Sequence, residues 1–266
     1  MPEGDTLYRT AAGLRPYLVG RPVTAARATR PGPQIERVVG STIDAVESHG
    51  KNLLIRFDNG LELRTHMRMN GSWHRYRPGE RWRRPPGRAR VVLEVPGAVA
   101  VCFDAPVVEL FEQRAESLHA ALANLGPDLL DPAFGDAEAG EALRRLREPI
   151  RADVPIGAAL LDQRAVAGLG NIWRNETLFA ERIDPLAPVR TLDDAALRRL
   201  IASGRRLLVQ SAGVAPGRAA VRVYRRTGRP CPRCGTPIRS APLPGDVPRT
   251  TYWCPSCQRQ DVAVAR

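Results

Sequence analysis

Four cysteines near the end of the chain place the tightest constraint on how it can fold. They are spaced as Cys231-x2-Cys234 and Cys254-x2-Cys257, with 19 residues between the two pairs. This spacing is typical of a zinc site, in which each pair forms a tight turn that directs two thiolates at one metal ion. A segment of about 40 residues buries too little apolar surface to fold alone, so metal binding would have to stabilise it. We therefore expect one structural Zn2+ per chain, with no ligand position left open for catalysis.

The alternative for these cysteines is a pair of disulfides, which are rare in the cytoplasm. The chain has no apolar run of about 18 residues, and it opens with the acidic sequence MPEGD, where a signal peptide would be basic. We therefore expect a cytoplasmic protein without a membrane segment. The fifth cysteine, Cys102, is expected to be an ordinary buried thiol.

The charge of the chain indicates a polyanionic partner. Forty Lys and Arg residues against 28 Asp and Glu give a net charge of +12 and a pI near 10.6, which favours nucleic acid over a membrane surface. The alternative is charge that only keeps the protein soluble. Lys51 is the single lysine, which suggests that this position needs an amine that can exchange a proton rather than a guanidinium. Codon bias is the alternative explanation.

The first half of the chain has the pattern of a helix followed by a β-sandwich. Apolar residues recur at Leu7, Ala11, Leu14 and Leu18, which predicts a helix capped by Asp5 or Thr6. Strand-like runs follow at 22–28, 42–48, 51–57, 61–69, 90–95, 98–103 and 107–111. Residues 75–90 contain many arginines and are expected to form either a mobile loop that faces phosphates or a merely solvated loop.

From residue 114 onward the periodicity becomes helical, with predicted helices at 114–123, 138–147, 155–162, 172–182 and 192–210. Thr191 and Asp194 have the spacing of a capping box for the last of these helices. The predicted fold class is α+β: an N-terminal β-sandwich domain with a leading helix at 1–113, a helical domain at 114–222 and a zinc finger at 223–266.

Residues 160–179 are predicted to form a helix, a glycine turn and a second helix. Gly168 and Gly170 flank the turn, and Asn171 opens the second helix. The N-terminus of a helix presents free N–H groups and partial positive charge, which suits a phosphate. An ordinary helical hairpin is the alternative.

The N-terminus itself can carry chemistry. If Met1 is removed, the chain begins with the secondary amine of Pro2, followed directly by the carboxylate of Glu3. A neutral amine can attack an electrophilic carbon and collapse to an iminium ion, provided that its pKa is low enough. A neighbouring cation or a helix N-terminus lowers the pKa of an α-amino group.

Together these motifs resemble the formamidopyrimidine-DNA glycosylase and endonuclease VIII family of base-excision repair enzymes. The resemblance runs from end to end in the family's order, through MPEG, GKNLLIRF, THMRMNGSW, LGPDLL, LLDQRAVAGLGNIWRNETLF, VYRRTGRPCPRCG and RTTYWCPSCQ. It implies an N-terminal β-sandwich, a helix–two-turn–helix (H2TH) domain and a zinc finger. It also implies a monomer that binds double-stranded DNA containing damaged bases or abasic sites, and a nucleoid-associated location.

The resemblance also implies roles for single residues. Pro2 would attack C1′ of the damaged nucleoside, and Glu3 would donate the proton that opens the sugar. Lys51 would donate a proton in β-elimination and hold a phosphate. Arg249 would grip phosphate and assist δ-elimination, and Asn171 would bind phosphate.

Three further residues are implied to contact DNA. Met69 occupies the position of the side chain that fills the hole left by an extruded base, and Arg68 beside it would also enter the duplex. Asn124, just before LGPDLL, is the third contact.

Departures from the family pattern favour the endonuclease VIII branch and oxidised pyrimidines as substrates. Residues 104–108 read DAPVV where the formamidopyrimidine branch carries Arg-Arg-Phe-Gly, and segment 212–221 is short where that branch has a long loop. Thr6 replaces a common glutamate, for which Asp5 is a candidate substitute. The alternatives are an 8-oxoguanine/formamidopyrimidine glycosylase and a DNA-binding protein of the same fold with weak or no catalysis.

Overall fold

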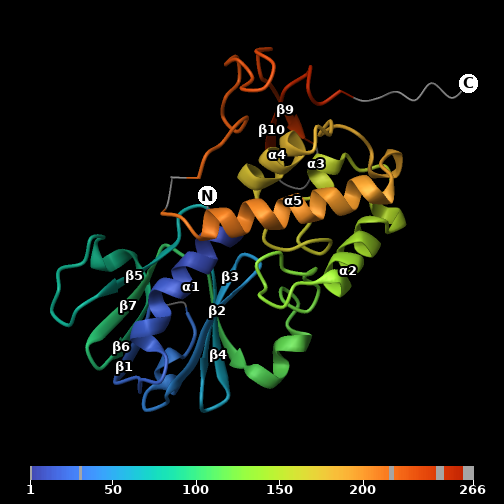
Figure 1. Cartoon of the computed structure of the whole chain (residues 1–266). Coiled ribbons are helices and arrows are strands. Elements are labelled where there is room, and N and C mark those ends of the chain that lie inside the picture. The colour runs from blue at the N-terminus through green and yellow to red at the C-terminus, as the bar shows by residue number, and fades with distance from the viewer. Residues whose placement is uncertain (1, 30–31, 216–218, 244–248, 260–266) are drawn as a thin grey trace, which may run out of the picture. The chain divides into compact units, whose positions relative to one another are not determined.

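The computed structural model describes residues 2–29, 32–215, 219–243 and 249–259 (Figure 1). The chain divides into two compact units, Met1–Asn124 and Leu125–Arg266. No helix in the described ranges is both long and apolar enough to cross a membrane.

The first unit is the predicted β-sandwich with a leading helix, α1 (Gly4–Leu18). One antiparallel sheet has the order β1-β6-β7-β5 and the other β2-β3-β4-β8. The first sheet comprises β1 (Ala25–Ala28), β6 (Ala89–Val95), β7 (Ala98–Phe103) and β5 (Ser72–Tyr76). The second comprises β2 (Ile43–His49), β3 (Asn52–Phe57), β4 (Leu61–His66) and β8 (Val107–Glu112).

One apolar core joins α1 to both sheets. Inward-facing side chains such as Leu14, Ile55, Leu63 and Leu93 are nearly inaccessible to solvent, as the alternation of a strand with one buried face requires. Cys102 is fully buried in β7, as expected. The first unit also has three short 3-10 helices, η1 (Ile35–Val38), η2 (Pro86–Arg88) and η3 (Gln113–Leu118).

Several sequence-based boundaries in this unit were wrong. Glu3, not Asp5 or Thr6, is the N-cap of α1. Strand β4 ends at His66 rather than at residue 69, and β5 was not predicted. The helix predicted at 114–123 is only η3, because Leu118 is 83% exposed and the segment has no continuous apolar face to bury.

The second unit contains four α-helices and a hairpin among its described residues. The helices are α2 (Asp136–Leu146), α3 (Ile156–Ala159), α4 (Asn171–Ala180) and α5 (Asp194–Ala212), with two short 3-10 helices, η4 (Pro149–Arg151) and η5 (Val189–Thr191). The hairpin pairs β9 (Arg239–Leu243) with β10 (Arg249–Trp253).

Helix α5 packs against both α2 and α4. Its N-cap is Asp193, whose carboxylate accepts the N–H of Ala196 at 2.6 Å. The predicted capping box was therefore wrong by two residues, and the Thr191 hydroxyl instead donates to the carbonyl of Pro188.

Candidate functional site

Pro2 and Glu3 lie at the start of α1, as predicted. Glu3 is only 1% exposed, and its backbone carbonyl accepts the N–H groups of Thr6 at 2.9 Å and Leu7 at 3.2 Å. Its carboxylate makes no capping hydrogen bond to the helix. Pro2 is partly exposed directly before it, so its nitrogen lies near the positive end of the helix dipole.

Asp5 is occupied within the first turn of α1. Its carboxylate accepts the N–H of Thr6 at 2.8 Å and forms an ion pair with Arg9 at 3.1 Å. The side chain is buried. These contacts give Asp5 a local role in the helix.

Lys51 lies in the tight turn between β2 and β3. Gly50 adopts φ +59° there, a conformation that costs glycine little. The Asn52 side chain donates to the His49 carbonyl at 3.0 Å and accepts from Nε of the buried Arg64 at 2.9 Å. The turn that carries the partly exposed Lys51 is therefore held at its base by Asn52.

His66, which was not predicted as a site residue, is a neighbour of this turn. It pairs across the sheet with Asn52, and its Nδ1 accepts the backbone N–H of Arg68 at 3.2 Å. Burial, aided by the positive charges of Arg64, Lys51 and Arg68, lowers the pKa of His66 to about 4. The imidazole is therefore neutral at neutral pH. Its place in THMRMNGSW was the only signal in the sequence.

Met69 lies in an exposed turn after β4, where the sequence analysis had placed a strand. The N–H of Gly71 donates to the Met67 carbonyl at 2.8 Å, and a Cβ on Gly71 would come within 2.7 Å of the Met67 backbone. Met67 is buried while Met69 is 55% exposed, and Arg68 has φ +43°. Asn52, the first residue of β3, pairs with His66, the last residue of β4. The Lys51 turn and the Met69 turn therefore lie at the same end of the sheet.

Asn124 is exposed in the turn that ends the first unit. Its contact with DNA stays a prediction from the family resemblance.

In the second unit, Asn171 opens α4 as predicted and lies against β10. Its side-chain amide donates to the Thr250 carbonyl at 3.2 Å. The fully buried Arg174 donates to the same carbonyl at 3.1 Å and to Oδ1 of Asn171 at 2.6 Å. These bonds fix the orientation of the Asn171 side chain.

Asn175 completes this polar contact. Its side-chain oxygen accepts the Thr251 hydroxyl and the Tyr252 N–H, both at 2.8 Å, and its amide donates to the Asn171 carbonyl at 2.5 Å. Strand β10, which begins with the partly exposed Arg249, is thereby fixed beside the start of α4. The structure thus brings the Asn171 and Arg249 segments together through Arg174 and Asn175, two residues that were not predicted from the sequence.

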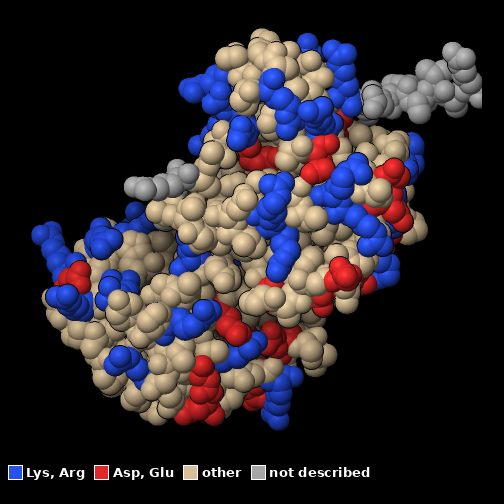
Figure 2. Space-filling model, in the orientation of Figure 1, with Lys and Arg blue, Asp and Glu red and all other residues tan. Residues whose placement is uncertain are grey.

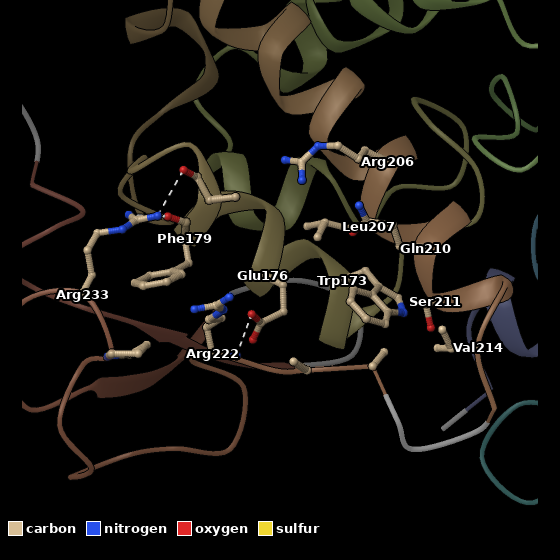
Figure 3. A pocket seen from close by; sticks show the side chains of 14 residues that line it. Trp173, Glu176, Phe179, Arg206, Leu207, Gln210, Ser211, Val214, Arg222 and Arg233 are labelled. Atoms are coloured by element: carbon tan, nitrogen blue, oxygen red, sulfur yellow. Dashed lines mark hydrogen bonds between the residues drawn. The ribbon is translucent and has the colours of Figure 1, made fainter.

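Glu176 holds the segment that leads to the cysteines against helix α4. Its carboxylate accepts three consecutive backbone N–H groups, from Arg222 at 2.8 Å, Val223 at 3.0 Å and Tyr224 at 2.9 Å. Such charge-assisted bonds are stronger than neutral ones. Glu176 and Arg222 also line a cavity of about 580 Å3 beside α4 and α5 (Figure 3).

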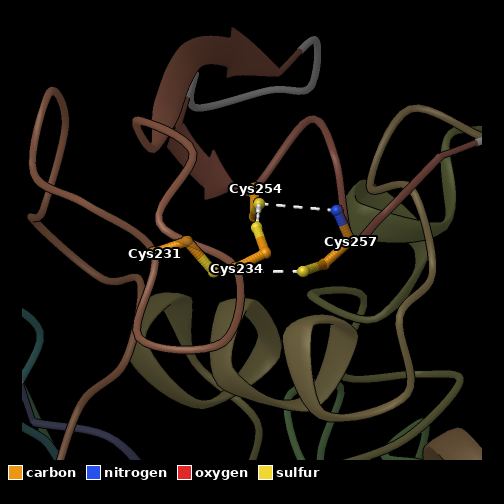
Figure 4. Close-up of side chains that lie close together, drawn as sticks. All are labelled: Cys231, Cys234, Cys254 and Cys257. Carbon is orange, nitrogen blue, oxygen red and sulfur yellow. Dashed lines mark hydrogen bonds between the residues drawn. The ribbon is translucent and has the colours of Figure 1, made fainter.

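The four cysteines form one cluster (Figure 4). Their sulfur atoms all lie within 4.8 Å of one another, and thiolates bound to one tetrahedral zinc ion lie about 3.8 Å apart, given Zn–S bonds of about 2.3 Å. Backbone N–H groups of Arg233 and Cys257 point at the sulfurs of Cys231 and Cys254, each at 3.4 Å. This donor set can hold a metal ion.

The cluster is supported by α4 and surrounded by basic side chains. Phe179, Val223 and Ile238 pack against the buried Cys231 and Cys254. Figure 2 shows many basic side chains, all of them arginine, around this end of the second unit. Positions 225, 226, 229, 233, 239 and 249 are arginine. A surface of this charge suits a phosphate backbone.

Family models match most of the chain. The formamidopyrimidine-DNA glycosylase N-terminal domain matches residues 1–106, and the H2TH domain of the same enzyme matches residues 125–223.

Whole-length relatives agree. A probable endonuclease 8 2 of Streptomyces coelicolor is 37% identical over 97% of this chain and 94% of its own. The DNA-(apurinic or apyrimidinic site) lyase Nei2 of Mycolicibacterium smegmatis is 36% identical over 97% and 99%. The formamidopyrimidine-DNA glycosylase of Methylococcus capsulatus is 32% identical over 97% and 100%.

The fold is also that of a solved structure. The Lactococcus lactis formamidopyrimidine-DNA glycosylase, in complex with DNA containing N7-benzyl-Fapy-dG, superposes with a TM-score of 0.82 over 97% of this chain and all of its own, at 23% identity. The resemblance drawn from the sequence motifs is thus confirmed by the family models, the relatives and the fold, and the chain belongs to the formamidopyrimidine-DNA glycosylase family.

Proposed function

We propose that the protein is a bifunctional DNA glycosylase and AP lyase of base-excision repair, of the endonuclease VIII type, that excises oxidised bases, mainly pyrimidines. The observation that carries this proposal is the start of α1, where Pro2 directly precedes the buried carboxylate of Glu3. Relatives named endonuclease 8 and AP lyase, at 36–37% identity over nearly the whole chain, support it. A protein that only binds DNA needs no amine beside a carboxylate.

The first chemical step uses the amine. After removal of Met1, the Pro2 nitrogen attacks C1′ of the damaged nucleoside, and the base leaves with the electrons of its bond to C1′. The Pro2 nitrogen then loses its N–H proton, the bond from C1′ to the ring oxygen breaks, and Glu3 donates a proton to that oxygen. The resulting iminium ion at C1′ acidifies the C2′ proton. Loss of that proton expels the 3′ phosphate, and a second elimination expels the 5′ phosphate, which leaves a one-nucleotide gap.

Lys51 serves the elimination steps in this proposal. The hydrogen bonds of Asn52 hold its turn, and its ammonium holds a phosphate and donates a proton. Arg249 assists departure of the second phosphate. Asn171, fixed by Arg174 at the start of α4, binds a phosphate.

Met69 fills the hole in the base stack. An extruded base leaves a gap that costs a few kcal/mol, and an unbranched apolar side chain that is already 55% exposed can occupy it. Arg68 enters beside it, and Asn124 contacts the backbone of the same duplex.

Cys231, Cys234, Cys254 and Cys257 would hold one structural Zn2+ as four thiolates. The ion would stabilise the segment that presents Arg249 and take no part in the reaction. We propose three functional parts for the chain: a catalytic sandwich at 1–113, an H2TH domain at 114–222 and a zinc finger at 223–266. We expect a monomer that works in the cytoplasm, at the nucleoid.

The test is borohydride trapping of the tag-free protein on duplexes that carry an abasic site, thymine glycol, dihydrouracil or 8-oxoguanine opposite cytosine. The proposal predicts covalent bands with the abasic site and with the pyrimidine lesions. Bands with 8-oxoguanine but not with the pyrimidine lesions would assign the formamidopyrimidine branch instead. Salt-sensitive binding without any band would mean that the fold only holds DNA.

A further inference from the structure

Asp104, at the end of β7, joins two arginines of the arginine-rich loop. Its carboxylate accepts from Arg84 Nη1 at 2.5 Å and from Arg88 Nε at 2.7 Å, and its backbone N–H donates to the Arg88 carbonyl at 3.0 Å. Asp104 adopts φ +54°, a left-handed conformation that Asp and Asn tolerate better than other side chains do.

The loop between β5 and β6 packs onto the outer face of its sheet. The Trp82 ring lies 6.0 Å from Tyr76 in a stacked arrangement and 5.7 Å from Phe103 edge-on. The backbone N–H of Arg83 donates to the Tyr76 hydroxyl at 3.1 Å. These contacts give the loop a defined course along β5 and β7 toward Asp104.

Arg84 links this loop to the Met69 turn. The same Nη1 that binds Asp104 donates to the carbonyl of Asn70 at 3.3 Å, one residue after the exposed Met69. The guanidinium therefore lies between the Asp104 carboxylate, directly after β7, and the backbone of the turn. Arg88 binds the same carboxylate, and its side chain has no described contact with the turn.

The ion pairs of Asp104 with Arg84 and Arg88 persist across the ordinary pH range. Burial of the Asp104 carboxyl opposes its ionisation, but hydrogen bonds from Arg88 and Arg84 outweigh this effect and lower its pKa. Asp104 is thus a carboxylate wherever the enzyme would work.

We propose that Arg84, held by Asp104, is a positioning residue that fixes the Met69 turn for insertion into the DNA duplex. The inference rests on the proposed function. A side chain that replaces an extruded base must resist a restacking energy of a few kcal/mol. The turn spans only a few residues, so a guanidinium bonded to its backbone limits how far Met69 can retreat.

The test compares Arg84→Ala with the matched control Arg88→Ala on one abasic oligonucleotide, as a duplex and as a single strand. The single strand has no base stack to fill. We expect Arg84→Ala to lower duplex cleavage about tenfold while single-strand cleavage stays within twofold. Arg88→Ala should stay within twofold of the parent on both substrates.

A second readout does not depend on chemistry. 2-Aminopurine placed opposite the abasic site fluoresces more strongly when it is unstacked, so its fluorescence should rise when the protein binds and inserts Met69. We expect Arg84→Ala to reduce this increase in fluorescence and Arg88→Ala to preserve it. If the parent protein cleaved neither substrate, the proposed function would fail. The fluorescence comparison of the Arg84 and Arg88 variants would still decide the role of Arg84.

A second variant guards against misfolding. Asp104→Asn keeps the left-handed backbone and removes the charge that holds Arg84, and we expect it to lower duplex cleavage three- to fivefold with single-strand cleavage preserved. Equal losses on both substrates, or identical behaviour of the Arg84 and Arg88 variants, would overturn the proposal.

Discussion

Lys51, the proposed proton donor in β-elimination, lies among residues that hold its turn in place. It is the only lysine among 40 basic residues, and it lies in a turn held by Asn52 and, through it, by the buried Arg64. Its neighbour His66 adds no positive charge at neutral pH, because the pKa of that imidazole is lowered to about 4. The backbone of the turn that carries Lys51 is therefore held at its base.

Lys51→Arg separates charge from proton transfer. Arginine keeps the positive charge but does not release a proton near neutral pH. We expect DNA affinity within about threefold of the parent and a lyase rate at least tenfold lower, since a positioned general acid contributes about 10²-fold or more. Single-turnover cleavage and a binding titration on the same abasic duplex measure the two effects. An unchanged rate would remove Lys51 from the elimination steps.

His66 should make stability depend on pH. Its folded pKa of about 4 lies below the ordinary value near 6.5, so the unfolded chain binds a proton that the folded chain does not. The contribution of the neutral imidazole to the free energy of unfolding is fully present above pH 6.5 and is lost as the pH falls from 6.5 to 4. Because the side chain is partly exposed, we expect a loss of about 1 kcal/mol at pH 5.

The matched variant for this prediction is His66→Asn, which can still accept the Arg68 N–H and does not titrate. Urea unfolding at pH 7 and pH 5 should show a smaller pH-dependent loss in the variant than in the parent. Equal losses in the two proteins would contradict the account of His66.

At the scale of elements, the contact between α4 and β10 determines where two predicted DNA-binding residues lie. Asn175, fully buried, bonds to the Thr251 hydroxyl and the Tyr252 backbone of the strand. Arg174 bonds to Asn171 and to the Thr250 carbonyl. The helix thus orients both its own first residue and the strand that begins with Arg249.

Asn175→Ala should disrupt this contact. It leaves the Thr251 hydroxyl and the Tyr252 N–H without their partner in a buried place, which costs about 2 to 4 kcal/mol. Thr177→Val is the control on the same helix, because Thr177 is equally buried and its hydroxyl has no hydrogen-bond partner. We expect that control to be neutral or slightly stabilising in thermal unfolding. Equal destabilisation by the two substitutions would refute the role given to Asn175.

Predictability from sequence differed between elements for physical reasons. The apolar period of α1, the glycines before Asn171 and the cysteine spacing are local signals, and the structure agrees with each. Strand β5 was missed because polar and charged residues, with His74 and Arg75 among them, obscure the two side chains it buries, Trp73 and Tyr76. The roles of Arg174, Asn175 and Asp104 depend on partners distant in the chain, and no local pattern encodes them.

At the scale of the whole molecule, the cysteine cluster links metal content to DNA binding. Chelation of the proposed Zn2+ should unfold the hairpin that carries Arg249, and DNA affinity should fall at least tenfold while the β-sandwich stays folded. Metal analysis should give one zinc per chain. Cys254→Ser should lower that value, whereas Cys102→Ser, a change of the buried cysteine of β7, should not. A folded, metal-free protein that binds DNA normally would contradict this role.

We propose the N-terminal amine of Pro2 as the nucleophile, and the single lysine of the chain makes this proposal simple to test. Once Met1 is removed, the Pro2 nitrogen and the Lys51 side chain are the only amines available to form an iminium ion, because the chain has one lysine. The most direct measurement is peptide mass mapping of the borohydride-trapped DNA adduct. We expect the deoxyribose remnant on the peptide that begins with Pro2. An adduct on the Lys51 peptide would contradict it.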